Sequence, residues 1–487
     1  MLKLRRFISL ALLVSMMCSV SCSNTDDNTK DTSDNSTLTD TDHSTSDTTA
    51  KVETAGYYDE LSGLDFNDYT FTIATYNSDK NGWNLYLTAE EASGDLISNA
   101  AYKRNTEVEE MLNINIEARK VGDYETLFKN AVLADDGEAF DLICFFASGQ
   151  YGSYITENLV YDWQEVPHLN LDADWYNQSA NETFTIAGKQ YFGVSDLTFP
   201  VQQNASIIFN IDMLEKHNLD SPYDLVREGK WTVDALNSYI KDIYVDANNN
   251  DLADENDSYG LVGAVNVFGR IMASSGELEI TKSDAGFKLN LFSDNIVNIF
   301  DKIRELYNNE ATLVAADGNV NINTFKKGNT LFCLYPSDPA LLRDIQFDFG
   351  YLPFPKADES QEDYITEAIG GMMAIPQSAK NIERTGAIVE ALSAGSHKYI
   401  NEAFIETYIE NKVLRSDDAV EMFRLCRDTY TYNFAFNIDP AGLLASHKFY
   451  AAILKDTTLE LASYYESQRE QITTAYDSLW EIAEGND

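Results

Sequence analysis

Residues 69–76 read YTFTIATY, a run of β-branched and aromatic residues that is typical of a strand. A polar loop with one glycine follows at 77–84, and apolar residues then recur at helical spacing from 96 to 112. Residues 114–118, INIEA, alternate as a second strand. This stretch predicts a strand, a loop, a helix and a strand in succession, which is the repeating unit of a parallel sheet.

The same pattern continues downstream. Residues 124–133 predict a helix, and residues 141–146, DLICFF, predict another buried strand. The opening third of the chain therefore predicts an α/β fold with a mainly parallel sheet flanked by helices. Because ligands of such sheets sit beyond the carboxyl ends of the strands, the loops after Tyr76 and Phe146 are the first candidate positions for a pocket.

Length and composition describe a large globular protein. The 487 residues suffice for two to four domains at roughly 100–200 residues each, and 44% of them are hydrophobic. Lys and Arg number 35 and Asp and Glu 79, so the formal net charge is −44. A surface of that charge repels phosphate backbones, and we therefore expect no nucleic acid partner.

The N-terminal segment predicts export. A basic stretch at 2–6 precedes a short apolar run at 8–14, and residues 19–22 read SVSC. This ending resembles the lipobox of bacterial lipoproteins, which implies cleavage within 1–22 and acylation of Cys22 with fatty acids such as palmitate. A plain secretory signal is the alternative. Residues 23–55 are rich in Ser, Thr, Asp and Asn and lack aromatic residues, so we expect a disordered tether between a membrane anchor and an extracytoplasmic body.

Cysteine usage is uninformative about chemistry. Beyond the signal, Cys144 and Cys333 lie in apolar runs and Cys426 is the third. An odd number of cysteines in such surroundings predicts buried thiols and no structural disulfide. No Cys/His spacing typical of a zinc site occurs, and the chain has only 5 His.

A series of short motifs in register extends through the body of the chain. Among them are DWQEVP at 162–167, DWY at 174–176, AGKQYF at 187–192, EGKWT at 228–232, GYLPFPK at 350–356 and GGMMAIP at 370–376. The series resembles the family 1 extracellular solute-binding proteins, which are receptors of ABC importers. The resemblance covers roughly residues 57–487, and each motif alone is weak.

This resemblance implies a fold like that of maltose-binding protein. Two α/β lobes would be joined by crossings near 195–205, 355–370 and 400, with one lobe formed by 56–200 and 361–400 and the other by 201–360 and 401–487. Members of the family most often bind sugars and oligosaccharides. The implied protein is a monomer without enzymatic activity, whose partners are a carbohydrate and the permease subunits of an importer.

Candidate ligand-binding residues follow from the chemistry of sugars, whose C–H faces pack on aromatic rings while their hydroxyls need polar side chains. Trp83, Trp175 and Tyr176 lie in polar stretches, and Asp196 lies near the first implied crossing. Trp231 begins a helical pattern, where it contacts ligand or anchors the helix to the core. The strand-end argument and the family motifs complete the candidate set, which is Tyr76, Trp83, Trp175, Tyr176, Asp196, Trp231, Tyr335 and Gly371.

Residues 246–257, DANNNDLADEND, have the spacing of a calcium-binding loop of the EF-hand type. The ligands would be Asp246, Asn248, Asn250, Asp254 and Asp257 through side chains and Leu252 through its carbonyl. Two positions depart from the pattern: Asp251 replaces the usual glycine, and Asp257 replaces the usual glutamate. Asp251 can adopt the left-handed conformation that the turn requires. We therefore expect a structural Ca²⁺, against the alternative of an Asx-rich solvated turn.

Two other functional classes stay open on the sequence alone. A surface-anchored glycoside hydrolase needs two carboxylates about 5–10 Å apart, and acidic residues are too abundant here for any pair to be informative. A glycan-capture or sensor module without a transporter would carry the same candidate residues.

Overall fold

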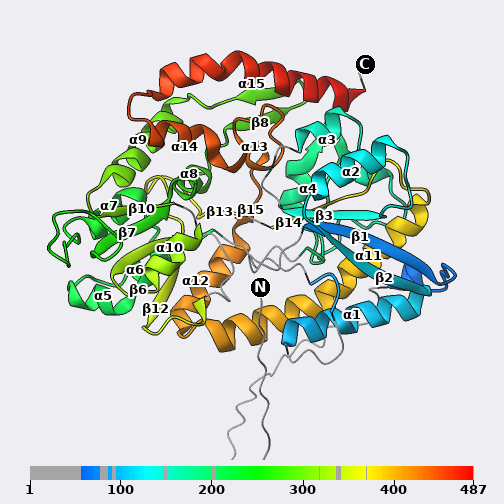
Figure 1. The fold of residues 1–487 in the computed structure, drawn as a ribbon, viewed down its shortest axis with the longest axis horizontal. Coiled ribbons are helices and arrows are strands. Elements are labelled where there is room, and N and C mark those ends of the chain that lie inside the picture. Colours follow the sequence, from blue (N-terminus) through cyan, green and yellow to red (C-terminus); the bar gives the residue numbers. More distant parts are fainter. Residues whose placement is uncertain are drawn as a thin grey trace, which may run out of the picture. The chain divides into compact units, whose positions relative to one another are not determined.

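The computed structural model describes residues 56, 58–76, 86–89, 95–146, 149, 151–198, 205–316, 318–335, 342–368 and 370–485. Trp83 and Cys22, and the side chain of Tyr335, lie outside what it describes. Two central sheets organise this part of the chain, each flanked by helices (Figure 1). We call the elements around the first sheet the N-lobe and those around the second sheet the C-lobe.

The N-lobe sheet has the strand order β14-β3-β1-β2, with β1 parallel to β2 and β3 and with β14 antiparallel to β3. Its elements are β1 (Tyr69–Tyr76), α1 (Leu96–Leu112), β2 (Ile114–Val121), α2 (Tyr124–Leu133), β3 (Leu142–Phe146), α3 (Gly152–Thr156), α4 (Gln178–Phe184), β4 (Thr185–Ile186), β5 (Lys189–Gln190), β14 (Gly371–Ala374) and α11 (Ile382–Ser396). The predicted strands and helices of the opening third are confirmed, as is their parallel pairing.

The C-lobe sheet has the order β10-β7-β11-β6-β12, in which β6 runs antiparallel to both of its neighbours. Its elements are β6 (Ser206–Asn210), α5 (Ile211–Lys216), α6 (Pro222–Arg227), α7 (Val233–Ile240), β7 (Tyr259–Ala264), α8 (Val265–Ser274), β8 (Ile280–Ser283), β9 (Gly286–Leu289), α9 (Asp294–Asn308), β10 (Thr312–Ala315), α10 (Gly318–Phe325), β11 (Thr330–Tyr335) and β12 (Phe349–Pro353).

The remaining elements connect the lobes or cover them. They are β13 (Thr366–Glu367), two π-helical segments (His397–Asn401 and Ala403–Val413), α12 (Asp417–Asp428), β15 (Tyr430–Thr431), α13 (Phe434–Asn437), α14 (Lys448–Lys455) and α15 (Leu461–Glu484), with short 3₁₀ turns at Asp59–Leu61, Trp163–Glu165 and Ala445–His447. The long helix α15 contacts α3 of the N-lobe as well as β9 of the C-lobe (Figure 1).

The connections between the lobes lie side by side. β13 pairs in parallel with β15, and the backbone amide of Ala205 donates to the carbonyl of Glu367 at 3.3 Å. The third connection is helical: α11 packs on α1, continues into the π-helical segments and leads to α12, which packs on β12. The fully buried Glu367 carboxylate accepts from Arg270 at 2.6 Å and lies 3.0 Å from the His447 ring nitrogen, which ties β13 to the C-lobe.

The cores hold the residues that the sequence assigns to them. Cys144 and Cys333 are buried in β3 and β11, and Cys426 is buried in α12, all three as free thiols. Burial raises the pKa of each thiol well above its usual range, so the charged, reactive form is disfavoured. Among the described residues, no helix is both long enough and apolar enough to cross a membrane.

Candidate functional site

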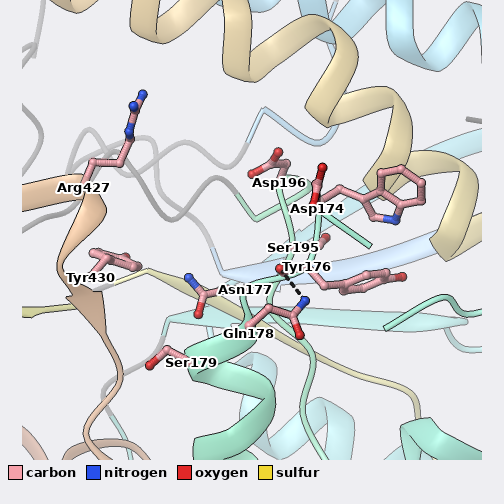
Figure 2. Close-up of a pocket in the computed structure, with 10 residues that line it drawn as sticks. Asp174, Tyr176, Asn177, Gln178, Ser179, Ser195, Asp196, Arg427 and Tyr430 are labelled. Atoms are coloured by element: carbon pink, nitrogen blue, oxygen red, sulfur yellow. Dashed lines mark hydrogen bonds between the residues drawn. The ribbon is translucent and has the colours of Figure 1, made fainter. Parts of the chain in front are cut away.

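A cavity of about 300 Å³ opens between the segment that precedes α4 and the end of α12. We call it the Asp196 pocket. Figure 2 shows Arg427 and Tyr430 on one side and Asp174 and Asp196 on the other. It is lined by Asp174, Trp175, Tyr176, Asn177, Gln178, Ser179, Ser195, Asp196, Arg427 and Tyr430. Residues far apart in the chain thus face one cavity.

Local hydrogen bonds bring the N-lobe wall together. The backbone amide of Asp196 donates to the carbonyl of Trp175 at 2.9 Å, which places 195–196 beside 174–177. Asn177 caps α4, because its side-chain oxygen accepts from the amide of Ala180 at 2.8 Å. Gln178 donates from its amide nitrogen to the carbonyl of Tyr176 at 3.1 Å (Figure 2). The first turn of α4 is therefore fixed as the floor of the pocket.

A buried carboxylate on α11 orients the two aromatic residues of this wall. Glu390 is 5% exposed and accepts from the Trp175 indole nitrogen at 3.1 Å and from the Tyr176 hydroxyl at 2.8 Å. A third donor, the amide of Asn170, lies 3.2 Å away. Burial raises the pKa of Glu390, and these three hydrogen bonds oppose that shift. Tyr176 is buried and Trp175 is half-buried, and both line the pocket.

Asp196 is held by residues of the π-helical connection. Its carboxylate oxygen lies 2.6 Å from the His397 ring nitrogen and accepts from the Asn401 side-chain amide at 3.3 Å. The hydrogen bond to Asp196 raises the pKa of His397, while burial raises the pKa of Asp196. The His397 ring lies 6.4 Å from the Trp175 ring. π-helical distortions are common at functional sites, and here one brings His397 and Asn401 to the same carboxylate.

The opposite wall is cationic and aromatic. Arg427 ends α12 with its side chain 35% exposed, and it makes a long contact of 3.4 Å to Asp428. Tyr430 follows on β15. Arg427 is the one cation among the ten lining residues. A pocket with acidic, amide and hydroxyl groups on one side and a guanidinium with a ring on the other matches a polar, uncharged ligand that offers hydroxyls and apolar faces.

The structure brings together three of the sequence-derived candidates, Trp175, Tyr176 and Asp196. It places three others elsewhere among the described residues. Tyr76 contacts the rings of Tyr124 and Phe146 at the end of β1, and Gly371 pairs with Phe146 inside the N-lobe sheet. The remaining candidates, Trp83 and Tyr335, fall on positions whose side chains are not described.

Trp231 is the third candidate that lies outside the Asp196 pocket. It is fully buried and donates from its indole nitrogen to the carbonyl of Pro353 at 3.1 Å. Its ring packs against those of Phe332 and Tyr239. Of the two roles that the sequence left open, the structure places Trp231 in the one that anchors α7 to the C-lobe core.

Sequence reasoning missed part of the pocket. Asp174 and Asn177 lie close to Trp175 in the same polar stretch, but they were not named as candidate ligand-binding residues. Arg427 and Tyr430, which line the pocket, and His397, which contacts Asp196, carry no local motif and lie about 200 residues or more beyond Trp175, Tyr176 and Asp196 in the chain. Their membership of the site depends on how the helical connection returns the chain to the N-lobe, which periodicity does not encode.

The loop 246–257 is held by hydrogen bonds between its own residues. Both oxygens of Asp246 accept backbone amides, from Asn250 at 3.2 Å and from Asp251 at 2.9 Å. Asp254 accepts from the side-chain amides of Asn248 at 3.1 Å and Asn250 at 2.9 Å. The Asp251 backbone is left-handed, with φ 59°, as predicted for an aspartate in the usual glycine position.

The donor set of this loop fits a hard cation only in part. Among the described residues, no three His, Cys, Asp or Glu side chains converge as metal ligands, so Asn248 and Asn250 would have to supply oxygens. At present their oxygens accept the backbone amides of Asn250 at 3.1 Å and Leu252 at 2.8 Å, so ion binding would require both side chains to turn. Asp257 is fully buried and accepts from the amides of Ala247 and Asp254, which positions its carboxylate beneath the loop.

Comparison with known proteins places the chain in a family. The family model of the bacterial extracellular solute-binding proteins matches residues 93–394. Among curated proteins, none matches the sequence significantly. The matched span includes the whole N-lobe wall of the Asp196 pocket as far as Asp196 and ends within α11.

Solved structures share the fold at low sequence identity. An extracellular solute-binding protein from Staphylococcus aureus in complex with maltose has a TM-score of 0.57 at 11% identity, covering 84% of this chain and 98% of that one. A cyclo/maltodextrin-binding protein complexed with maltotetraose has a TM-score of 0.55 at 15% identity, covering 86% and 97%. The lacto-N-biose complex of the galacto-N-biose-/lacto-N-biose I-binding protein from Bifidobacterium longum has 0.54 at 12%, covering 85% and 98%. The predicted two-lobed α/β class is confirmed.

Proposed function

Because the chain belongs to the family of bacterial extracellular solute-binding proteins, we propose that it captures a sugar or oligosaccharide in the Asp196 pocket and delivers it to an ABC importer. The observation that carries the proposal is the pocket itself, in which Asp174 and Asp196 of the N-lobe face Arg427 and Tyr430 at the end of α12. A ligand that touches both walls favours the arrangement in which they are close.

The lining supports a carbohydrate over other solutes. Hydroxyl groups can donate to Asp174 and Asp196 and accept from Arg427, while Trp175 and Tyr430 offer ring surface to C–H faces. The cavity of about 300 Å³ lies at the small end of ligand sites, which suits one or two sugar rings. The three related structures contain maltose, maltotetraose and lacto-N-biose, which makes these the first compounds to test.

The direct test is binding of these three sugars to the purified protein by calorimetry, combined with analysis of the sugar after incubation. We expect at least one to bind and to be recovered intact. Asp174→Ala should weaken that binding by about 1–3 kcal/mol, the scale of hydrogen bonds to a charged group. Asp174 is exposed and lines the pocket, so its carboxylate is accessible to a ligand.

Asp172→Ala is the matched control, because Asp172 is also exposed and lies two residues earlier, outside the Asp196 pocket. It should bind as the wild type does. Equal affinities of the Asp174 and Asp172 variants would show that the sugar binds elsewhere. Steady release of shorter sugars, abolished by replacing one acid, would assign the protein to the glycoside hydrolases instead.

Membership of this family places the folded body outside the cytoplasm. We further propose that Cys22 is acylated and anchors the chain to the membrane, with 23–55 as the tether. Cys22→Ala should then move the protein from the membrane fraction to the soluble fraction, because the tether contains no apolar segment that could hold it. Membrane retention of the Cys22 variant, measured by fractionation and immunoblotting, would contradict the anchor.

We also propose that the loop 246–257 binds one Ca²⁺ in a structural role. The support is the spacing of the oxygen-bearing residues, together with the hydrogen bonds that hold Asp246, Asn248, Asn250 and Asp254 in one loop. The loop links α7 to β7 in the C-lobe and contributes no residue to the Asp196 pocket, so its ion would stabilise the fold and leave ligand chemistry unaffected.

A further inference from the structure

Lys282 joins the C-lobe hairpin to a helix of the N-lobe. It lies on β8, in the hairpin β8–β9 between α8 and α9. Its ammonium nitrogen donates to three backbone carbonyls, those of Glu182 at 2.6 Å, Thr183 at 2.6 Å and Thr185 at 2.8 Å. The carbonyls of Glu182 and Thr183 belong to the last turn of α4, where no following turn supplies amide donors, and Thr185 is the residue that ends the helix. A lysine from the other lobe thus caps this helix.

The hairpin that carries Lys282 is itself firmly held. Phe287, which pairs with Lys282 across the hairpin, contacts the rings of Phe434, Tyr476 and Trp480. The ammonium group also lies 5.5 Å from the centre of the Phe434 ring. A cation on a rigid support can fix the position of whatever it binds.

The side chain of Lys282 is partly withdrawn from water. Burial lowers the pKa of Lys282 to about 8, and the charge of Glu182 on α4 opposes that shift. The half-buried cation therefore loses hydration that the three carbonyls replace. Two further hydrogen bonds hold α4 along its length to the β15 segment: the Ser179 and Thr431 hydroxyls lie 3.0 Å apart, and the Thr183 hydroxyl donates to the carbonyl of Tyr432 at 3.3 Å.

The other end of α4 forms the Asp196 pocket. Asn177 caps the helix there, and Gln178 and Ser179 of its first turn line the cavity. At 1.5 Å per residue a seven-residue helix is about 10 Å long, so displacing its last turn moves its first turn. Isolated helices of this length are unstable, which makes α4 dependent on contacts at its ends.

We propose that Lys282 is a positioning residue of the ligand pocket, which acts by capping α4 from the opposite lobe and thereby holds Asn177, Gln178 and Ser179 in place for ligand. The identity of the ligand rests on the proposed function, whereas the positioning role depends only on the contacts between Lys282 and α4. Neither the local sequence around Lys282 nor its distance along the chain from the pocket residues suggests this role.

The first test needs no sugar. Hydrogen–deuterium exchange is measured on the full folded protein for the peptide 178–186 in four forms: wild type, Lys282→Met, Lys282→Arg and Lys288→Met. Methionine keeps the apolar stem against Phe434 and removes the charge. Lys288 is exposed on the neighbouring strand, so its variant controls for loss of one positive charge from the hairpin.

We expect faster exchange of α4 in Lys282→Met and wild-type exchange in Lys282→Arg and Lys288→Met, since arginine restores cationic donors. Unchanged exchange of α4 in Lys282→Met would overturn the proposal. Lys282→Arg behaving like Lys282→Met would overturn it too, because the cation would then not be what holds the helix. Uniformly faster exchange across the C-lobe would assign Lys282 a purely structural role.

The second test measures affinity for maltotetraose, maltose and lacto-N-biose by calorimetry. Where wild type binds, Lys282→Met should bind about tenfold more weakly and Lys282→Arg within about twofold, because affinity falls with the fraction of molecules whose pocket is formed. Equal affinity of Lys282→Met and wild type would overturn the positioning role. If wild type binds none of the three sugars, the sugar assignment fails and the exchange experiment alone decides on Lys282.

Discussion

Asp196 illustrates how a residue that sequence reasoning singled out acquires its role from partners that the sequence does not reveal. The carboxylate is 13% exposed, close enough to the pocket to meet a ligand and buried enough to need compensation. His397 and Asn401 supply that compensation from the π-helical connection. A carboxylate whose orientation is fixed by two donors presents its remaining lone pairs in a defined direction, which is what recognition of a sugar hydroxyl requires.

The His397–Asp196 pair predicts a pH dependence of stability. Because the folded-state pKa of His397 is raised above 6.5, its contribution is fully present below pH 6.5 and is lost as pH rises through the higher folded-state value. Burial also raises the pKa of Asp196, so its contribution to stability changes in the same direction and begins to be lost as pH rises above its usual value of 3.8. We therefore expect the melting temperature of wild type to fall as pH is raised above 6.5, and His397→Gln to show a smaller fall.

His217→Gln provides the control for this measurement. Burial lowers the pKa of His217, so its contribution is present above pH 6.5 and changes in the opposite direction. The His217 variant should keep the fall seen in wild type. A His397 variant with the full wild-type fall would show that the pair does not contribute to stability at these pH values.

Helices and strands could be predicted from the sequence where their formation depends on residues that are close together in the chain. β1, α1 and α2 match the predicted ranges because the residue types and the spacing that indicate each element occur within one short stretch of sequence. β13 and β15 are two residues long and were not predicted, because their existence depends on the lobes meeting at the crossings. The π-helical segments were also not predicted, since nothing in their composition distinguishes them from an ordinary helix.

The loop 246–257 leads to a prediction about the effect of Ca²⁺ on stability. An ion that binds only the folded loop stabilises the protein by mass action, by about 2.7 kcal/mol at one hundred times its Kd. In metal-free buffer, added Ca²⁺ should raise the melting temperature, and chelator should reverse the increase. Asp246→Ala should abolish the difference, because Asp246 would be the first side-chain ligand of the proposed ion and accepts the backbone amides of Asn250 and Asp251.

Asp284→Ala, in the turn of the β8–β9 hairpin, controls for removing one acidic residue from the C-lobe surface. It should keep the calcium response. If Ca²⁺ leaves the melting curve of wild type unchanged, the loop is a solvated turn stabilised by its Asx hydrogen bonds.

For the whole molecule, the sequence predicted the two-lobed class through motifs spread over the chain, and the match of the family model agrees with it. It did not predict the contacts that bridge the lobes on the side of α4. There Lys282 caps α4, α15 reaches α3, and Gly152 lies so close to Pro440 that a side-chain carbon at Gly152 would come within 2.8 Å of it. Such contacts join residues that are more than 90 positions apart, beyond any local pattern.

We propose that the ligand is held between two lobes that close on it, and small-angle X-ray scattering measures such closure. Differential affinity for the closed arrangement drives closure, so a bound sugar should shift the population toward it. With whichever of maltose, maltotetraose or lacto-N-biose binds by calorimetry, we predict that saturation lowers the radius of gyration relative to the ligand-free protein, with the sugar recovered intact. A saturated complex with the same radius of gyration as the free protein would contradict this account and indicate a rigid capture module.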